Sequence, residues 1–138
     1  LCIGDERYAL ELASIWEIFP FRPLTAVPGL PAMVRGVFNF RGEIIPLYDL
    51  AALVSGQATK SAPTGACVVL GQERIEFAVA VDRVEPPARL TTAELRPSLA
   101  RPGDRNFNYI RGFTAQGAIV LNAGALLNDD SLIIDLQA

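Results

Sequence analysis

Three carboxylates within the first 50 residues are the side chains whose type best suits chemistry. Two carboxyl groups held close together can act as a general acid and a general base. The candidates are Glu17, Glu43 and Asp49, and they fall in separate predicted elements, so their spacing gives no reason to expect convergence. We therefore expect solvated or ion-paired carboxylates at these positions, and no catalytic residues.

The residue types that are missing exclude several classes of enzyme. The chain has no histidine, which excludes Ser-His-Asp and Cys-His catalysis and the usual zinc and non-haem iron ligand sets. It also has no Cys-x-x-Cys, no glycine-rich phosphate loop and no dinucleotide-binding fingerprint. Cys2 and Cys67 each lie among apolar residues of strand type, which predicts two buried free thiols. We expect no metal, no cofactor and no enzymatic activity.

The composition leaves a surplus of apolar side chains to be buried. Of the 138 residues, 51% are hydrophobic, and no run of apolar residues is long enough to span a membrane. The surplus must go into a large core, into partner surfaces or into both. The net charge is −3 and there is no basic cluster, which argues against nucleic acid as a partner. The sequence begins at Leu1 within a predicted strand, which indicates a piece of a longer protein.

A polar turn between two apolar runs is the most distinctive local feature. Residues 37–40 and 43–48 are predicted to pair as a β-hairpin around Arg41-Gly42. Phe38 and Phe40 share one face by alternation, which predicts core positions. Pro46 lacks an N–H group, so it predicts a sheet edge or a bulge.

The sequence repeats itself, and only one copy carries this polar turn. Residues 4–12 return as 71–81, and residues 34–47 return as 110–121, in the same order. Where the first copy has Asn39-Phe40-Arg41-Gly42-Glu43, the second has Thr114-Ala115-Gln116-Gly117-Ala118. The repeat indicates a duplicated lobe, and the difference between the copies indicates where function lies.

The remaining elements are short strands with little helix. Short helices are predicted over residues 50–54, with Asp49 as the cap, and near residues 123–127. Polar stretches over residues 55–65 and 89–108 predict a linker and a second loop. Many short strands separated by Gly and Pro indicate an all-β barrel fold. Its strands are predicted over residues 8–12, 15–19, 37–40, 43–48, 66–70, 75–81, 84–85, 110–114, 118–122 and 132–136.

The stretch from Val27 to Leu50 resembles the signature of the CheW-like family. The matching pieces are Gly36, the turn Asn39-Phe40-Arg41-Gly42, and the strand Ile44-Ile45-Pro46-Leu47-Tyr48-Asp49-Leu50. Residues 8–10 and 15–18 are similar to the opening strands of the family, and residues 77–84 to its mid-chain strand. Residues 89–108 have no matching family pattern, and Asn122-Ala123-Gly124 departs from the usual end of the last strand.

The resemblance implies one CheW-like domain over residues 1–138, in which two SH3-like five-stranded β-barrel lobes share a core. It implies a non-catalytic cytoplasmic adaptor of bacterial chemosensory signalling. Such an adaptor links the cytoplasmic tip of a methyl-accepting chemotaxis receptor to the regulatory domain of a CheA-type histidine kinase. The partner-binding residues that it implies are Ile15, Glu17, Val37, Asn39, Arg41 and Glu43.

Two residues leave alternative interpretations open. Arg41 is either a solvated turn residue or, by the resemblance, one half of an ion pair with Glu17. Trp16 either covers the junction of the lobes or anchors an interface.

Two other functions also remain open. The chain is alternatively a CheW-like regulatory domain from a larger kinase or from a receiver-fused protein. A β-barrel that binds a small molecule is a further alternative, because the apolar surplus and the unplaced carboxylates suit a ligand site.

Overall fold

The computed structural model describes residues 1–26, 28, 29, 31, 33–55, 63–97 and 109–129. Most of the regular secondary structure in the described residues is strand, as predicted, and the two α-helices are short. The elements are β1 (Cys2–Ile3), β2 (Glu6–Ala9), η1 (Leu12–Ser14), β3 (Ile15–Pro20), β4 (Val34–Phe40), β5 (Glu43–Tyr48), α1 (Leu50–Ser55), β6 (Ala66–Gly71), β7 (Ile75–Val81), η2 (Thr92–Glu94), β8 (Ile110–Phe113), β9 (Ile119–Leu121) and α2 (Ala123–Leu127). Neither helix is long and apolar enough to cross a bilayer.

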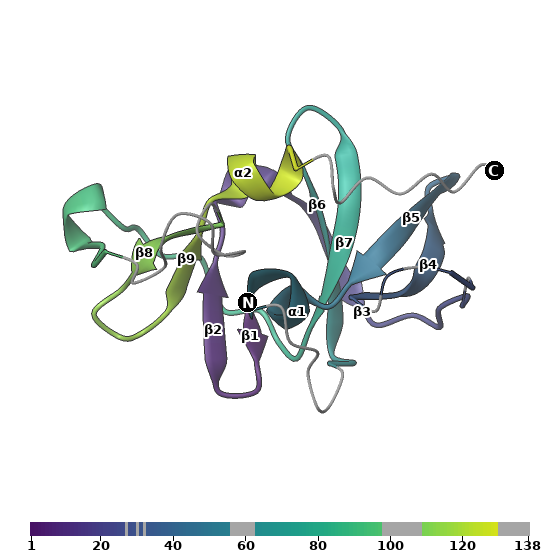
Figure 1. The fold of residues 1–138 in the computed structure, drawn as a ribbon, viewed down its shortest axis with the longest axis horizontal. Helices are drawn as coiled ribbons and strands as arrows, with labels where there is room; N and C mark the ends of the chain where they lie inside the picture. Colours follow the sequence, from purple (N-terminus) through teal and green to yellow (C-terminus); the bar gives the residue numbers. More distant parts are fainter. Residues whose placement is uncertain (27, 30, 32, 56–62, 98–108, 130–138) are drawn as a thin grey trace.

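The strands form two sheets. One has five strands in the order β3-β6-β7-β5-β4, and the other has four in the order β1-β2-β9-β8. Figure 1 shows the four-stranded sheet on the left and the five-stranded sheet on the right, with α1 and α2 between them. In the four-stranded sheet an isolated bridge joins Cys2 of β1 to Arg83. β1 corresponds to β6 of the other sheet, so Arg83 lies where β3 pairs with β6.

The duplication predicted from the sequence is present, but the two copies are interleaved. The hairpin β1–β2 lies beside β8–β9 through a parallel pairing that includes Tyr8 and Ile119. The hairpin β6–β7 lies beside β4–β5 through a parallel pairing that includes Ala78 and Leu47. Each sheet therefore combines a hairpin from the first half of the chain with one from the second half.

The two copies also match in local detail. The register of β4 with β5 shifts between Val34 and Gly36, and that of β8 with β9 shifts between Ile110 and Gly112. After each hairpin a polar residue caps a helix: Ala52 N–H donates to the Asp49 carboxylate at 3.2 Å, and Ala125 N–H donates to the Asn122 side chain at 3.1 Å. These shared features confirm the duplication independently of sequence similarity.

One core is shared by both sheets, and a second belongs to the five-stranded sheet alone. The shared core takes Tyr8 and Leu121 from one sheet, Val68 and Val79 from the other, and leucines from both helices. The second core lies on the opposite face of the five-stranded sheet. It holds Phe38, Phe40, Ile45, Leu47, Cys67, Val69, Ala78 and Ala80. The predicted core positions of the two phenylalanines are confirmed, with exposed fractions of 6% and 2%.

Several predicted details differ from the structure. Pro46 was predicted at a sheet edge or a bulge; β5 is an internal strand, so the edge position was wrong, and the register shift of β4 with β5 lies between Val34 and Gly36, next to the Val37–Pro46 pair. The missing N–H of Pro46 is tolerated because the pairing of β5 with β7 begins only at Leu47. β2 ends at Ala9, short of the predicted residue 12, and residues 84–85 form no strand. The predicted strand at 132–136 and most of the predicted linker at 55–65 lie outside the described residues.

Candidate functional site

The polar turn between β4 and β5 is a two-residue hairpin turn. Phe40 pairs with Glu43, and both residues between them have positive φ: 51° at Arg41 and 88° at Gly42. This is the backbone of a type I′ turn, whose twist matches the twist of the strands. The Asn39 side chain accepts a hydrogen bond from Gly42 N–H at 3.0 Å, which holds the turn. Arg41 is the only described non-glycine residue with positive φ.

Arg41 forms the ion pair with Glu17 that the resemblance implied. Its Nη2 donates to Glu17 Oε1 at 3.1 Å, and its guanidinium carbon lies 5.0 Å from the centre of the Phe40 ring. The Arg41 side chain is 69% exposed and the Glu17 side chain is 36% exposed. Exposed ion pairs of this kind contribute little to the free energy of unfolding, so folding alone does not explain this pair and partner contact is the alternative.

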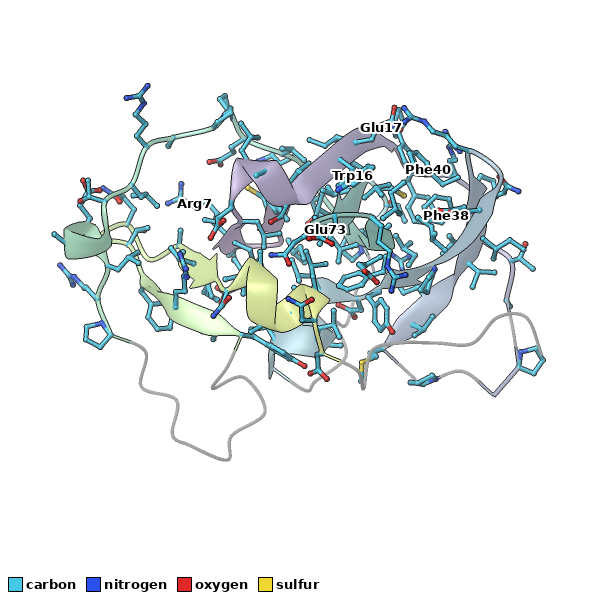
Figure 2. All side chains as sticks on the ribbon, turned by 90° about the horizontal axis from the view of Figure 1, so that it is seen from above. Arg7, Trp16, Glu17, Phe38, Phe40 and Glu73 are labelled. Carbon is cyan, nitrogen blue, oxygen red and sulfur yellow. The ribbon has the colours of Figure 1, made fainter. Side chains whose placement is uncertain are left out.

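The aromatic core under the turn brings β3 to this position. β3 and β4 are the two edge strands of the five-stranded sheet, and Phe19 of β3 packs between the rings of β4. Its ring centre lies 5.7 Å from that of Phe38, edge to face, and 5.8 Å from that of Phe40, stacked. Because Glu17 and Phe19 point to the same side of β3, this packing places the Glu17 carboxylate beside the turn (Figure 2).

The structure gathers four of the six predicted partner-binding residues. Glu17, Asn39, Arg41 and Glu43 lie at or beside the turn, together with the exposed Ile44; we call these five residues the tip surface. Val37 does not contribute to it, because its side chain is only 6% exposed.

Ile44 was missed in the sequence, although alternation could have found it. It is 57% exposed and pairs with Asn39, whereas its neighbour Ile45 is buried in the second core. An isoleucine on the outward face of a hairpin is a candidate for partner contact.

The sixth predicted residue, Ile15, lines a separate apolar groove. The groove has a volume of about 820 Å³ and lies between β3, the inner face of the four-stranded sheet and the segment 84–91. Leu12 and Ile18 on its wall are 65% and 44% exposed. Trp16, between Ile15 and Ile18 in sequence, does not line the groove; its Nε1 lies close to Gly71 and it is 45% exposed. The indole therefore lies against the backbone at Gly71 and also keeps part of its ring exposed to solvent.

The charged residues at the rim of the groove pair with one another. Arg7 lies 3.7 Å from Glu85, and Arg111 lies 3.3 Å from Glu11. All four line the groove. The groove is therefore an apolar surface whose rim charges are already balanced, which suits a long apolar partner segment more than a charged ligand.

The potential reactive groups are held in unreactive states. Burial raises the pKa of both thiols, Cys2 and Cys67, which disfavours the nucleophilic thiolate. Asp49 caps α1 at the far end of β5 from Glu43, so these two carboxylates cannot act as a pair. Among the described residues no cluster of His, Cys, Asp or Glu is arranged to hold a metal ion.

A family model described as CheW-like domain matches residues 1–131. The chain belongs to the CheW-like domain family. The resemblance predicted from the sequence is thereby confirmed, and so is the β-rich fold with a shared core. Of the two lobes predicted with five strands each, one has a five-stranded sheet and the other a four-stranded sheet among the described residues.

Relatives within the CheW-like family include proteins named for chemotaxis. The chain is 29% identical over 113 residues to a probable chemotaxis protein CheW of Rhizobium etli, covering 82% of this chain and 73% of that one. It is 33% identical to chemotaxis protein CheW of Helicobacter pylori, covering 75% and 63%. The crystal structure of the scaffolding protein TtCheW from Thermoanaerobacter tengcongensis superposes with a TM-score of 0.71 at 18% identity, covering 87% and 84%. That structure supports the fold.

Proposed function

We propose that this chain is a non-catalytic cytoplasmic adaptor of chemosensory signalling, which couples a chemoreceptor tip to a CheA-type histidine kinase. Its membership of the CheW-like family, with relatives named chemotaxis protein CheW, supports the signalling role. The observation that carries the proposal is the presence of two separate surfaces suited to partners, the exposed tip surface and the apolar groove.

The tip surface is the proposed contact with the kinase regulatory domain. The second copy of the hairpin, β8–β9, forms with a turn that holds Gln116 and no arginine, so the fold does not need the ion pair. A solvent-exposed ion pair that is present in only one of the two copies is better explained by recognition of a partner than by folding. The arginine fork can hold Glu17 and still donate to an acceptor on the partner.

The groove is the proposed contact with the receptor. A chemoreceptor tip is a helical hairpin, and an amphipathic helix binds by laying an apolar stripe into an apolar groove. Leu12, Ile15 and Ile18 offer such a stripe on one wall. Because the groove and the tip surface use different faces of β3, both partners can bind one copy of the chain at once.

Coupling then needs no chemistry by this chain. An adaptor that binds one conformation of the kinase more tightly than another shifts the kinase between them by its difference in binding free energy. The receptor, bound through the groove, changes which kinase conformation the complex favours.

Binding of each partner separately tests the proposal. The purified chain should bind both a CheA-type regulatory domain and a receptor cytoplasmic hairpin, measured by calorimetry. Arg41→Ala should weaken only the kinase complex, and Leu12→Asp should weaken only the receptor complex. If neither partner is retained at about 50 µM, where a micromolar complex is mostly formed, the adaptor function is wrong for this chain.

A further inference from the structure

The two sheets differ in how their inner faces are filled. Thr25 bonds to Val37 by two backbone hydrogen bonds, and Arg96 bonds to Phe113 in the same way, so these positions correspond. It follows that Thr114 takes the place of Phe38. In the same frame Ala118 takes the place of Ile45 and Val120 that of Leu47.

Each of these replacements is smaller than its counterpart. The five-stranded sheet has a packed aromatic core at this location, whereas in the four-stranded sheet Thr114 lines an open space and Ala118 and Val120 line the groove beside it. Gly112 allows the segment that carries Arg96 to lie close, because a Cβ at Gly112 would come within 2.4 Å of the Arg96 carbonyl oxygen. The space is therefore walled by backbone that is held in place.

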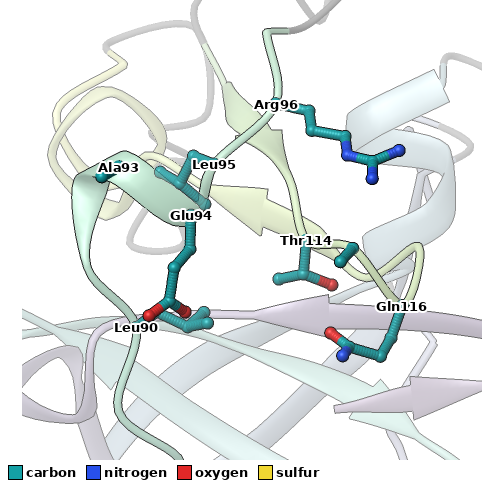
Figure 3. Close-up of a pocket in the computed structure, with 8 residues that line it drawn as sticks. Leu90, Ala93, Glu94, Leu95, Arg96, Thr114 and Gln116 are labelled. Carbon is teal, nitrogen blue, oxygen red and sulfur yellow. The ribbon is translucent and has the colours of Figure 1, made fainter.

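This space, which we call the side hollow, has a volume of about 420 Å³ and opens off the groove. Four residues line both: Leu90, Leu95, Thr114 and Gln116. In Figure 3 the Glu94 carboxylate lies next to Leu90, whereas Arg96 extends to the other side of Thr114. On one side the side hollow thus presents Leu90 with the Glu94 carboxylate beside it, and Arg96 lines the other side.

Glu94 differs from the acids at the rim of the groove. Glu11 and Glu85 each lie within 4 Å of an arginine, but no ion pair to Glu94 is present among the described residues. Leu90 beside it is 43% exposed. An unpaired carboxylate next to an exposed aliphatic surface complements a side chain with an apolar stem and a cationic end, which is the chemistry of lysine and arginine.

We propose that the side hollow binds a lysine or arginine side chain of the receptor hairpin that lies in the groove, with its stem on Leu90 and its charge at Glu94. This inference rests on the proposed function of the groove. It assigns Glu94 the role of selecting among receptors, because the groove itself is apolar and its rim charges are already paired. The pairing also fixes the direction of the hairpin along the groove.

The test measures the affinity of the chain for a receptor hairpin at low and at high salt. Glu94→Gln should weaken binding about fivefold at low salt and reduce the salt dependence, as loss of a partly exposed ion pair does. Glu94→Lys should weaken it further. Glu73→Gln is the matched control, because Glu73 is an exposed acid on the β6–β7 turn that lines neither space, and it should leave binding unchanged.

A charge exchange then identifies the partner residue. Each lysine or arginine of the hairpin is replaced by glutamate, and one of these variants should bind Glu94→Lys more tightly than it binds the wild-type chain. If the wild-type chain binds the hairpin and Glu94→Gln binds equally well, the inference about the side hollow is wrong while the proposed function stands. If the wild-type chain does not bind the hairpin at all, both are wrong.

Discussion

Replacing Arg41 should separate partner binding from folding. The Arg41–Glu17 pair is 3.1 Å long and largely exposed, so Arg41→Ala should lower the free energy of unfolding by less than about 1 kcal/mol. Arg41 also has φ of 51°, which costs a residue with a Cβ roughly 1 kcal/mol or more. Arg41→Gly removes that strain and should be about as stable as the wild type.

The loss of affinity for the kinase regulatory domain should be larger than the loss of stability, and it should be the same for Arg41→Ala and Arg41→Gly. Truncating one member of a charge pair that becomes desolvated in an interface costs about 2–5 kcal/mol, which is a loss of at least about 30-fold in affinity. Relief of backbone strain cannot restore it, because the guanidinium is missing in both variants. Glu17→Ala should show a smaller loss that is not additive with that of Arg41→Ala, since the two side chains contact each other.

The assay pairs urea unfolding with calorimetric titration of the kinase regulatory domain, for the single variants and the double variant. Glu73→Gln, at an exposed acid outside the tip surface, is the charge control. Normal binding by a folded Arg41→Ala variant would show that the site lies elsewhere. A loss of more than about 3 kcal/mol in unfolding free energy would show instead that Arg41 is structural. Strict additivity would mean that Glu17 and Arg41 do not act together.

Three further predictions concern the fold. Phe40→Ala, which removes a ring from the second core, should lower the free energy of unfolding by about 3–5 kcal/mol in a urea titration; a loss below about 1 kcal/mol would contradict that packing. Burial raises the pKa of Tyr8 and of Tyr48 to about 12, so their contribution to stability should be constant below about pH 10 and fall between about pH 10 and 12, because the tyrosines of the unfolded chain ionise first. Absorbance titration with thermal unfolding measures this, and ionisation of both tyrosines near pH 10 in the folded chain would contradict it. Because each sheet holds a hairpin from each half of the chain, a chain cut at an engineered protease site between residues 56 and 62 should stay associated in size-exclusion chromatography, and separate elution of the pieces would contradict the interleaved topology.

The sequence predicted the local elements well because their signals are local. Alternation around Arg41-Gly42 specified the hairpin, and Asp49 before an apolar run specified the start of α1. The duplication was visible because corresponding hairpins kept their order along the chain. The exchange of hairpins between sheets was not visible, because the parallel pairings of β2 with β9 and of β5 with β7 join residues distant in sequence.

The candidate site was predictable in part for the same reason. The tip surface depends on one turn and one partner strand, so four predicted residues meet there. Val37 was misplaced because alternation gives the face of a residue but not what covers that face. The groove and the side hollow could not be predicted, since they arise where Thr114 and Ala118 fail to fill a space that larger residues fill in the other sheet.

The measurement that tests the central claim most directly is the formation of a ternary complex. The chain, a CheA-type regulatory domain and a receptor hairpin are mixed and examined by sedimentation velocity. Because the tip surface and the groove are separate, we predict one complex that contains all three components. Arg41→Ala should remove only the kinase domain from it, and Leu12→Asp should remove only the receptor hairpin. Mutual displacement of the two partners, or loss of both by either substitution, would contradict an adaptor with two independent binding surfaces.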